Sequence, residues 1–325
     1  MLLGKKIKIT TETVLALILL IHFSIFQLIF CKPNISTYIN FNFSILVFII
    51  LSLALYDTKK EVIINISEKL IYVSLPLLIY EGYYRIANPI TLTNFAEKGR
   101  KDLEFYYFKY NSIMYLDSNY VGLFTNSLFF FLLYLKQFTH KKYYFTLLLL
   151  STLTFTTLSR ASILSLTIFA FLYFIRDKIY NYRYVIFLLC IFLLTPLLSV
   201  LSKYSNIDDS FATKFKILYE TWEYIRNIDL KTLFFGIGFG NTTQVLDIGA
   251  HNFISVYLIE SGLVGFSLFI LFWSYMLYRS DLKAGIVMFP FLFNSLSLTS
   301  GAIPYLYVIF AVILTLETKD KKNDR

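Results

Sequence analysis

The sequence predicts an all-α protein that crosses a membrane about ten times, and three observations support this fold class. Of the 325 residues, 57% are hydrophobic and 16% are charged, whereas a soluble domain carries about a quarter charged residues. Apolar runs long enough to cross a bilayer as helices recur along the whole chain. Runs such as LFFFLLYL do not alternate polar and apolar residues, as the strands of a membrane barrel do.

The distribution of charge and cysteine narrows the class further. The formal charge of +9 does not indicate a nucleic-acid partner, because more than half of the 30 lysines and arginines fall in segments expected to be cytoplasmic. This bias predicts that both termini are cytoplasmic. We expect neither a disulfide nor a metal site at Cys31 and Cys190. The first apolar run, 14–30, lacks a small-residue cleavage site and is predicted to be a retained anchor.

The first half of the chain predicts six spans, at about 13–30, 41–56, 70–80, 117–135, 143–159 and 161–175. The third is the least regular, because Glu68 and Lys69 precede its clean apolar part. The apolar stretch 143–175 is too long for one ordinary span. We therefore expect two short helices that meet at TLSRAS, with Arg160 at their outer end.

The second half predicts four more spans, at about 184–201, 251–278, 284–298 and 303–316, followed by a polar cytoplasmic tail. The eighth, 251–278, is expected to be one continuous helix that protrudes or tilts. The whole chain, 1–325, is expected to form a single integral membrane domain.

Two long segments are expected on the non-cytoplasmic side. Residues 81–115 mix aromatic residues with charges of both signs, which fits a solvated loop with interfacial tyrosines or a surface that contacts sugars. Residues 202–250 contain a predicted amphipathic helix that lies along the membrane surface. Its apolar positions recur at helical spacing: Phe215, Leu218, Trp222 and Ile225.

Arg160 and His251 are the leading candidates for chemistry. A guanidinium at the membrane edge is costly, so Arg160 either reaches water, pairs with a carboxylate or binds phosphate oxygens with its planar fork. His251 lies where a polar loop meets an apolar helix. A lone histidine is structural by default, but its titration near neutrality would let it take a proton from a sugar hydroxyl. Asn252 follows it, and Glu260, farther along the same helix, is expected to have a polar partner.

The segment GIGFGN, residues 236–241, permits two interpretations. A nucleotide-binding loop is disfavoured, because no strand precedes the segment and no P-loop lysine follows it. We interpret the glycines as a tight turn that brings the loop onto the helix after His251. The basic residues upstream could face a phosphate or be solvated: Lys214, Lys216, Arg226 and Lys231.

In their order and spacing, these motifs resemble the O-antigen polymerase and ligase superfamily of bacterial cell-envelope glycosyltransferases. The residues that carry the resemblance, over about 117–316, are Asp117-Ser118-Asn119, Ser159-Arg160-Ala161, the basic stretch with Trp222, GIGFG, His251-Asn252 and Glu260-x-Gly262-x-x-Gly265. The first hundred residues match only as generic membrane spans.

The resemblance implies that glycan passes from undecaprenyl pyrophosphate to an acceptor sugar at the outer face of the bacterial inner membrane, without a metal, nucleotide sugar or other cofactor. It implies Arg160 on the pyrophosphate, and His251 at the acceptor hydroxyl. The further candidates are Lys214, Lys216 and Arg226 for the pyrophosphate, and Asn119, Asn252 and Glu260 in supporting roles. Where the family often has an arginine, this chain has Lys214 and Lys216, which lack the bidentate geometry.

Within this interpretation the leading function is a polymerase of O-antigen or capsular repeat units, because the chain and its loops are short. The implied partners are the lipid-linked oligosaccharide, membrane lipids and a chain-length regulator protein. The alternatives are a ligase that transfers glycan to lipid A core, a transporter of lipid-linked sugars, and a purely structural membrane protein. A transporter would place charges along a path at the bilayer midplane, where these spans carry few.

Overall fold

The computed structural model describes residues 10–90, 108–109, 111–115, 117–181, 209–246, 252–298 and 303–323. The described residues are helical and contain no strand, so the all-α class is confirmed for this part of the chain. Three predictions lie outside the described residues: the span at 184–201, Cys190 within it, and His251. Residues 247–250 also lie outside them.

The described helices overlap the predicted spans but differ from several of them in their ends. They are α1 (Thr11–Ile21), which continues through the π-helical His22–Phe26 into α2 (Gln27–Phe30), then α3 (Ile35–Leu55), α4 (Lys60–Ala87), α5 (Ser118–Leu135), α6 (Tyr144–Thr156), α7 (Arg160–Asn181), α9 (Asp209–Asn227), α10 (Leu230–Phe235), α11 (Phe253–Arg279), α12 (Gly285–Ser295) and α13 (Pro304–Asn323). Short 3-10 turns lie at Lys136–Phe138 and Thr242–Gln244.

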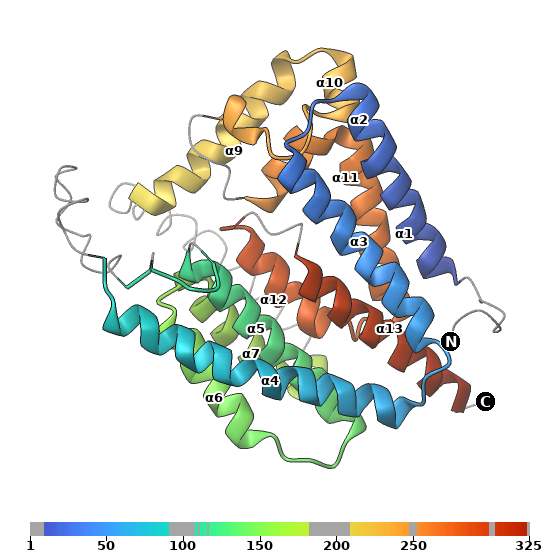
Figure 1. The fold of residues 1–325 in the computed structure, drawn as a ribbon, viewed down its shortest axis with the longest axis vertical. Coiled ribbons are helices and arrows are strands. Elements are labelled where there is room, and N and C mark those ends of the chain that lie inside the picture. Colours follow the sequence, from blue (N-terminus) through green and yellow to red (C-terminus); the bar gives the residue numbers. More distant parts are fainter. Residues whose placement is uncertain are drawn as a thin grey trace.

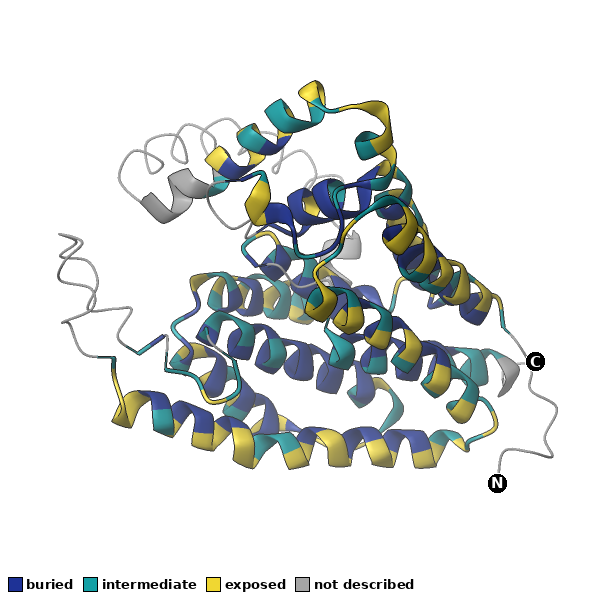
Figure 2. Ribbon diagram, turned by 45° about the horizontal axis from the view of Figure 1, so that its top comes forward, coloured by how far each residue is buried: buried dark blue, intermediate teal, exposed yellow. Residues whose placement is uncertain are grey.

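Five of these helical segments are long and apolar enough to cross a membrane. They are Thr11–Phe30, Ile35–Leu55, Lys60–Ala87, Ser118–Phe138 and, counted end to end across a break at Gly262, Phe253–Arg279. The outward faces of α1, α3 and α4 carry many exposed aliphatic side chains, while α5 is buried almost all round (Figure 2). Because water does not favour such exposed apolar faces, the pattern indicates a helical bundle with lipid at its periphery.

The helices form two layers that cross at an angle (Figure 1). In one, α4, α5, α7, α12 and α13 lie roughly alongside one another, and in the other, α1 and α3 lie beside α11. The layers meet where α13 packs against α3. The helices α9 and α10 lie across one end of the second layer.

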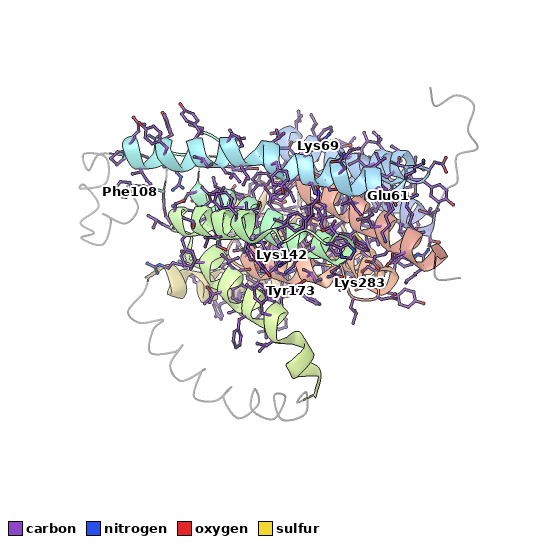
Figure 3. All side chains as sticks on the ribbon, turned by 90° about the horizontal axis from the view of Figure 1, so that it is seen from below. Glu61, Lys69, Phe108, Lys142, Tyr173 and Lys283 are labelled. Atoms are coloured by element: carbon purple, nitrogen blue, oxygen red, sulfur yellow. The ribbon has the colours of Figure 1, made fainter. Side chains whose placement is uncertain are left out.

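One end of the bundle, which we call the terminal end, carries the start of α1 and the end of α13. Ion pairs join helices there: Glu12 with Arg279 at 2.9 Å, Lys283 with Glu317 at 2.8 Å and Lys60 with Asp320. At the opposite end, which we call the loop end, α4 ends and α5 and α7 begin. Figure 3 shows Phe108 near the loop end of α4 and Glu61 near its other end.

The helix α4 differs from its prediction. It is continuous from Lys60 to Ala87, so Glu81 belongs to the helix and the long loop begins after Ala87. Glu68, which seemed to interrupt the span, is buried and paired with Lys141 at 2.6 Å and with the hydroxyl of Tyr143. A carboxylate inside an apolar helix is tolerated where such partners satisfy it.

The C-terminal helix also extends farther than expected. The predicted span stops at about 316, but α13 continues to Asn323. Polar residues of its last turns pair with neighbouring segments, as Lys321 does with Asp281, in the turn between α11 and α12, at 2.8 Å. These contacts let a segment predicted as a polar tail remain helical.

Candidate functional site

Three cationic side chains from separate parts of the chain gather at the loop end. Lys109 lies between α4 and α5, Arg160 is the first residue of α7, and Lys214 belongs to α9. Arg160 and Lys214 are close enough to Lys109 for their charges to lower its pKa. We call Lys109, Arg160 and Lys214, with Asp117 and Asn119, the loop-end cluster. Lys214 belongs to the second long loop of the prediction, so a basic residue of that loop and Arg160 both act on Lys109.

The turn between α6 and α7 positions Arg160. The helix α6 ends at Thr156, Leu158 adopts a left-handed φ of 56°, and α7 begins at Arg160. The hydroxyl of Ser159 accepts a hydrogen bond from the Ser162 amide at 3.4 Å, which is helix capping. The break predicted at TLSRAS is therefore confirmed, and the side chain of Arg160 is exposed at the start of α7.

The start of α5 is tied to the same turn. The hydroxyl of Ser118 donates to the carbonyl of Thr157 at 2.7 Å. Asp117 caps α5, and its carboxylate accepts from the amide of Asn119 at 2.9 Å and from the Asn119 side chain at 2.8 Å. The first turns of α5 and α7 thus lie side by side, with Asn119 and Arg160 at their exposed ends.

Lys109 is hydrogen-bonded to Ser118 and Asn119 at the start of α5. Its carbonyl accepts from the Ser118 amide at 3.0 Å, and its Nζ donates to Oδ1 of Asn119 at 3.3 Å. Only 7% of the residue is exposed. A lysine buried to this extent costs free energy unless a negative group compensates it, and Asp117 is the carboxylate whose charge acts on it.

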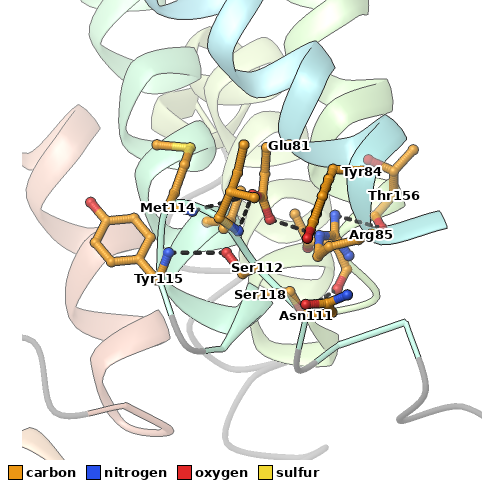
Figure 4. Close-up of polar contacts among 12 residues, drawn as sticks. Glu81, Tyr84, Arg85, Asn111, Ser112, Met114, Tyr115, Ser118 and Thr156 are labelled. Atoms are coloured by element: carbon orange, nitrogen blue, oxygen red, sulfur yellow. Dashed lines mark hydrogen bonds and ion pairs between the residues drawn. The ribbon is translucent and has the colours of Figure 1, made fainter. Parts of the chain in front are cut away.

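A buried ion pair below the cluster fixes the segment that carries Lys109 (Figure 4). Arg85 donates through Nε to Glu81 at 2.9 Å, through one terminal nitrogen to the carbonyl of Phe108 at 2.9 Å and through the other to Thr156 at 3.1 Å. Glu81 also accepts from the amide of Ile113 at 2.8 Å. The ion pair of Glu81 and Arg85 therefore links α4 to the end of α6 and to the segments 108–109 and 111–115 of the first loop.

The charges of the cluster define what it can bind. Lys109, Arg160 and Lys214 are cations, and the carboxylate of Asp117 acts on Lys109. Arginine and lysine at one point suit a ligand with several anionic oxygens, such as a pyrophosphate. The cluster lies at the end of apolar helices.

The protonation of Lys109 predicts how anion binding depends on pH. Burial lowers the pKa of Lys109, Asp117 raises it, and Arg160 and Lys214 lower it further, with a net downward direction. An anion favours the protonated lysine, so affinity should be constant below this lowered pKa and fall as the pH rises through it, before an ordinary lysine would titrate. Titration calorimetry with inorganic pyrophosphate, from neutral to alkaline pH, measures this.

The variant Lys109→Arg is the control for that experiment. Arginine keeps its charge throughout the alkaline range, so the decline in affinity should be absent or move to higher pH. An identical decline in both proteins would show that Lys109 does not contribute to anion binding.

Lys216 and Arg226, the other pyrophosphate candidates of the second loop, pair with acidic neighbours on the same helix. Lys216 is exposed and pairs with Glu220 at 3.4 Å, and Arg226 is exposed and pairs with Glu223 at 3.9 Å. All four residues lie on α9, and such exposed pairs contribute little to stability. A role for Lys216 or Arg226 in binding pyrophosphate stays a prediction.

The helix α9 is confirmed, and its two faces differ. Ile217 is buried with Leu246, Val256 and Ile259, while Leu218 and Trp222 of the predicted apolar stripe are exposed. An exposed tryptophan beside a buried face fits a helix that lies on an apolar surface, as predicted for the membrane interface.

The glycine segment before α11 makes a close backbone contact with that helix. Gly236, Gly238 and Gly240 have φ values of 77°, 100° and 78°. The amides of Ile237 and Gly238 donate to the carbonyls of Ile259 and Glu260, each at 3.0 Å. This agrees with the interpretation of GIGFGN as a tight turn onto the helix.

Glu260 has the expected polar partner. Its carboxylate is buried and accepts from the hydroxyl of Thr242 and from the Thr242 amide at 3.3 Å. The partner lies in the turn after the glycine segment, so Glu260 holds that segment against α11. This contact gives Glu260 a structural role. A supporting role for Glu260 in catalysis stays a prediction.

The prediction that 251–278 is one continuous helix is wrong. Gly262 has φ 64° and ψ −174°, which breaks α11 into the arms 253–261 and 263–279. The rings of Tyr257 and Phe269 lie 4.3 Å apart, although twelve residues of straight helix would separate them by about 18 Å. Phe253 similarly lies 5.9 Å from Trp273. The first arm therefore folds back along the second.

Asn252 caps the first arm, and its side chain accepts from the amides of Ile254 at 2.9 Å and Ser255 at 3.4 Å. It is buried, and Phe253, which follows it, lies against Trp273, which in turn contacts Phe310 of α13 at 5.5 Å. The start of α11 thus lies among the helices and not at a protruding end. The role of the neighbouring His251 stays a prediction.

Sequence reasoning missed Lys109, Glu81 and Arg85. A usable signal was present, because Glu81 and Arg85 are four residues apart and can pair on one helix face. Lys109 stands alone in the aromatic segment FYYFKY. Assigning 81–115 entirely to a loop concealed the helical spacing of the pair.

We compared the chain with protein-family models, with curated proteins and with solved structures, and none of the three comparisons finds a match.

Proposed function

We propose that this protein is a membrane glycosyltransferase that acts on a polyprenyl-pyrophosphate-linked glycan, and that it polymerises repeat units of O-antigen or capsular polysaccharide. One observation supports the proposal: at the loop end of a bundle of apolar helices, the charges of Arg160 and Lys214 both act on the buried Lys109. A pyrophosphate attached to a polyprenyl chain combines the anion that suits this cluster with the apolar tail that suits the surrounding bilayer.

The cations act on the leaving group. As the bond between the sugar and the pyrophosphate breaks, negative charge develops on the pyrophosphate oxygens. Cations that are already positioned for this charge stabilise the transition state more than the ground state. Arg160, exposed at the start of α7, contacts the pyrophosphate directly in this proposal, with Lys214 beside it and Lys109 below.

The acceptor sugar needs a base for its attacking hydroxyl, and His251 is the proposed group. Its support comes from the sequence, because it is a titratable residue directly before Asn252 and α11. The cytoplasmic ends of the spans are proposed to be at the terminal end, and the cluster is proposed to face the periplasm of a bacterial inner membrane.

The test is polymer formation in a deletion strain that expresses single variants. Arg160→Ala and His251→Ala are each expected to lower polymer formation about 100-fold or more, as loss of a group that stabilises the transition state does. Lys142→Ala, which removes an exposed cation between α5 and α6, is the control and should give normal polymer. A gel of surface polysaccharide and an immunoblot of the membrane fraction measure polymer and insertion.

The same gel separates the alternatives. Loss of a polymerase leaves single repeats on the lipid core, whereas loss of a ligase leaves bare core. Normal long polymer from the Arg160 or His251 variant would remove that residue from the site. Cysteine labelling that puts positions 160 and 251 on opposite sides of the membrane would contradict the proposal as a whole.

A further inference from the structure

The π-helical segment His22–Phe26, between α1 and α2, lies against both parts of the fold-back. Such bulges are rare inside α-helices and are frequent at functional sites. The segment packs against α3 and α11, and the ring of Phe23 lies 5.0 Å from that of Phe239 in the glycine segment. One turn farther along, Gln27 donates to the carbonyl of Glu260, just before the break in α11, at 3.2 Å. The π-helical segment therefore contacts α11 and the glycine segment at once.

His22, the first residue of this segment, is buried. It is 5% exposed, and its Nε2 atom has no hydrogen-bond partner among the residues that the structure describes. The imidazole stacks on Phe26 at 5.2 Å and meets Phe23 edge-on at 5.4 Å. A Cβ added to Gly265 would lie 3.1 Å from Nε2. This nitrogen therefore lies against the backbone of the second arm of α11, directly after the break.

The two protonation states of His22 fit this position differently. A neutral imidazole has one N–H donor and one acceptor nitrogen, whereas an imidazolium carries a full positive charge and two donors. Burial of an unpaired charge costs much more free energy than burial of a neutral polar group. The packed arrangement therefore suits the neutral ring.

Among the described residues of the elements around His22, no carboxylate is placed to compensate an imidazolium. The helices α2 and α3 carry no acidic or basic residue. On α1 and α11, Glu12 pairs with Arg279 at 2.9 Å at the terminal end, and the carboxylate of Glu260 accepts from the Thr242 amide at 3.3 Å. Lys231 of α10 is exposed and positive, so it opposes a second positive charge nearby.

The other titratable groups of these elements do not gain charge in acid. Tyr38 of α3 donates to the carbonyl of Ser24 at 2.9 Å, and Cys31 donates to the carbonyl of Gly236 at 3.3 Å. Tyr257 lies in the first arm of α11. Tyrosine and cysteine side chains are neutral below neutral pH, so they leave an imidazolium at His22 without a counter-charge.

We propose that His22 is an acid-sensitive switch, in which protonation of the imidazole separates the π-helical segment from α11 and loosens the glycine segment. Above the pKa of a free histidine, about 6.5, the ring is neutral and the contact has its full strength. As the pH falls below this value, an opened form in which the imidazolium reaches water gains stability relative to the closed form. The proposal does not depend on the glycosyltransferase function.

Hydrogen–deuterium exchange of the full chain in detergent, read by mass spectrometry, tests the proposal. Wild-type protein and His22→Gln are compared at the same pH, because glutamine keeps a polar side chain that acid does not protonate. At about pH 5, peptides from 19–30, 234–241 and 258–266 should exchange about 10–30-fold faster in the wild type, the factor expected about 1.5 pH units below the pKa of a free histidine. At neutral pH the two proteins should exchange alike.

His140→Gln is the matched control, because His140 is an exposed histidine in the turn between α5 and α6. This variant should behave like the wild type at both pH values. If His22→Gln does not fold, His22→Phe provides an uncharged ring beside Phe23 and Phe26, and it should show the same resistance to acid.

Three outcomes would overturn the proposal. The first is equal exchange of these peptides in the wild type and the His22 variants at about pH 5. The second is an acid-induced rise of the same size in all of them, which would assign the effect to another group, such as the carboxylate of Glu260. The third is a rise spread evenly over every helix, which would indicate global unfolding in place of a local opening.

Discussion

Gly262→Ala is expected to prevent the fold-back of α11 and to lower the yield of folded protein severely. With φ 64° and ψ −174°, Gly262 occupies a backbone region that is essentially restricted to glycine, and another residue there costs about 1–3 kcal/mol. An added Cβ would also lie 2.4 Å from the carbonyl oxygen of Phe234 and 2.6 Å from the amide nitrogen of Gly236. The backbone of both segments would have to separate.

That separation would break contacts that hold the glycine segment. The hydrogen bonds from Ile237 to Ile259 and from Gly238 to Glu260 cross this approach, and Gln27 of α2 donates to the carbonyl of Glu260 at 3.2 Å. The loss would affect α2, α10 and the first arm of α11 together. Size-exclusion profiles and thermal unfolding of the detergent-solubilised protein measure the effect.

Gly82→Ala is the matched control. Gly82 lies inside α4, and an added Cβ would be 3.5 Å from the hydroxyl of Thr156, which is an ordinary contact. Alanine in a helix interior is favoured over glycine by about 0.5–1 kcal/mol, so this variant should unfold at an equal or higher temperature. If Gly262→Ala behaved like Gly82→Ala, the break in α11 would not be required.

Arg85→Met is expected to destabilise the protein by about 3–5 kcal/mol, because it leaves the buried carboxylate of Glu81 without its cation. Arg85 is 1% exposed and Glu81 is 0% exposed. The change also removes the donors to the carbonyls of Phe108 and Thr156. Equilibrium unfolding in detergent measures the loss, and pyrophosphate binding should weaken because Lys109 follows Phe108.

Two further variants make this prediction specific. The double change Glu81→Gln with Arg85→Met should cost less than Arg85→Met alone, because no buried charge is left unpaired. Arg226→Met removes an arginine from the exposed pair with Glu223 and should cost about 0–1 kcal/mol. Equal losses in Arg85→Met and Arg226→Met would mean that the buried pair does not hold the loop.

Much of the fold could be predicted from the local sequence. The lengths of the apolar runs predicted α5, α6 and α12 to within about three residues, and the excessive length of 143–175 predicted the break before Arg160. The sequence predicted that Arg160 and the second long loop lie at the same face, without indicating which basic residue of the loop is near Arg160. In the structure the charge of Lys214 acts on Lys109, a residue that no local pattern marked.

What the sequence determined by itself is the all-helical class, the apolar character of the helices and their approximate bounds, since these depend on runs of neighbouring residues. Only the tertiary structure decided that α11 folds back at Gly262, that Glu81 and Arg85 pair inside the bundle and that Lys109 joins Arg160. The physical reason is that helix faces toward lipid and toward protein are both apolar, so hydrophobicity does not specify which helices meet. Those meetings depend on backbone approaches and ion pairs between residues far apart in the chain.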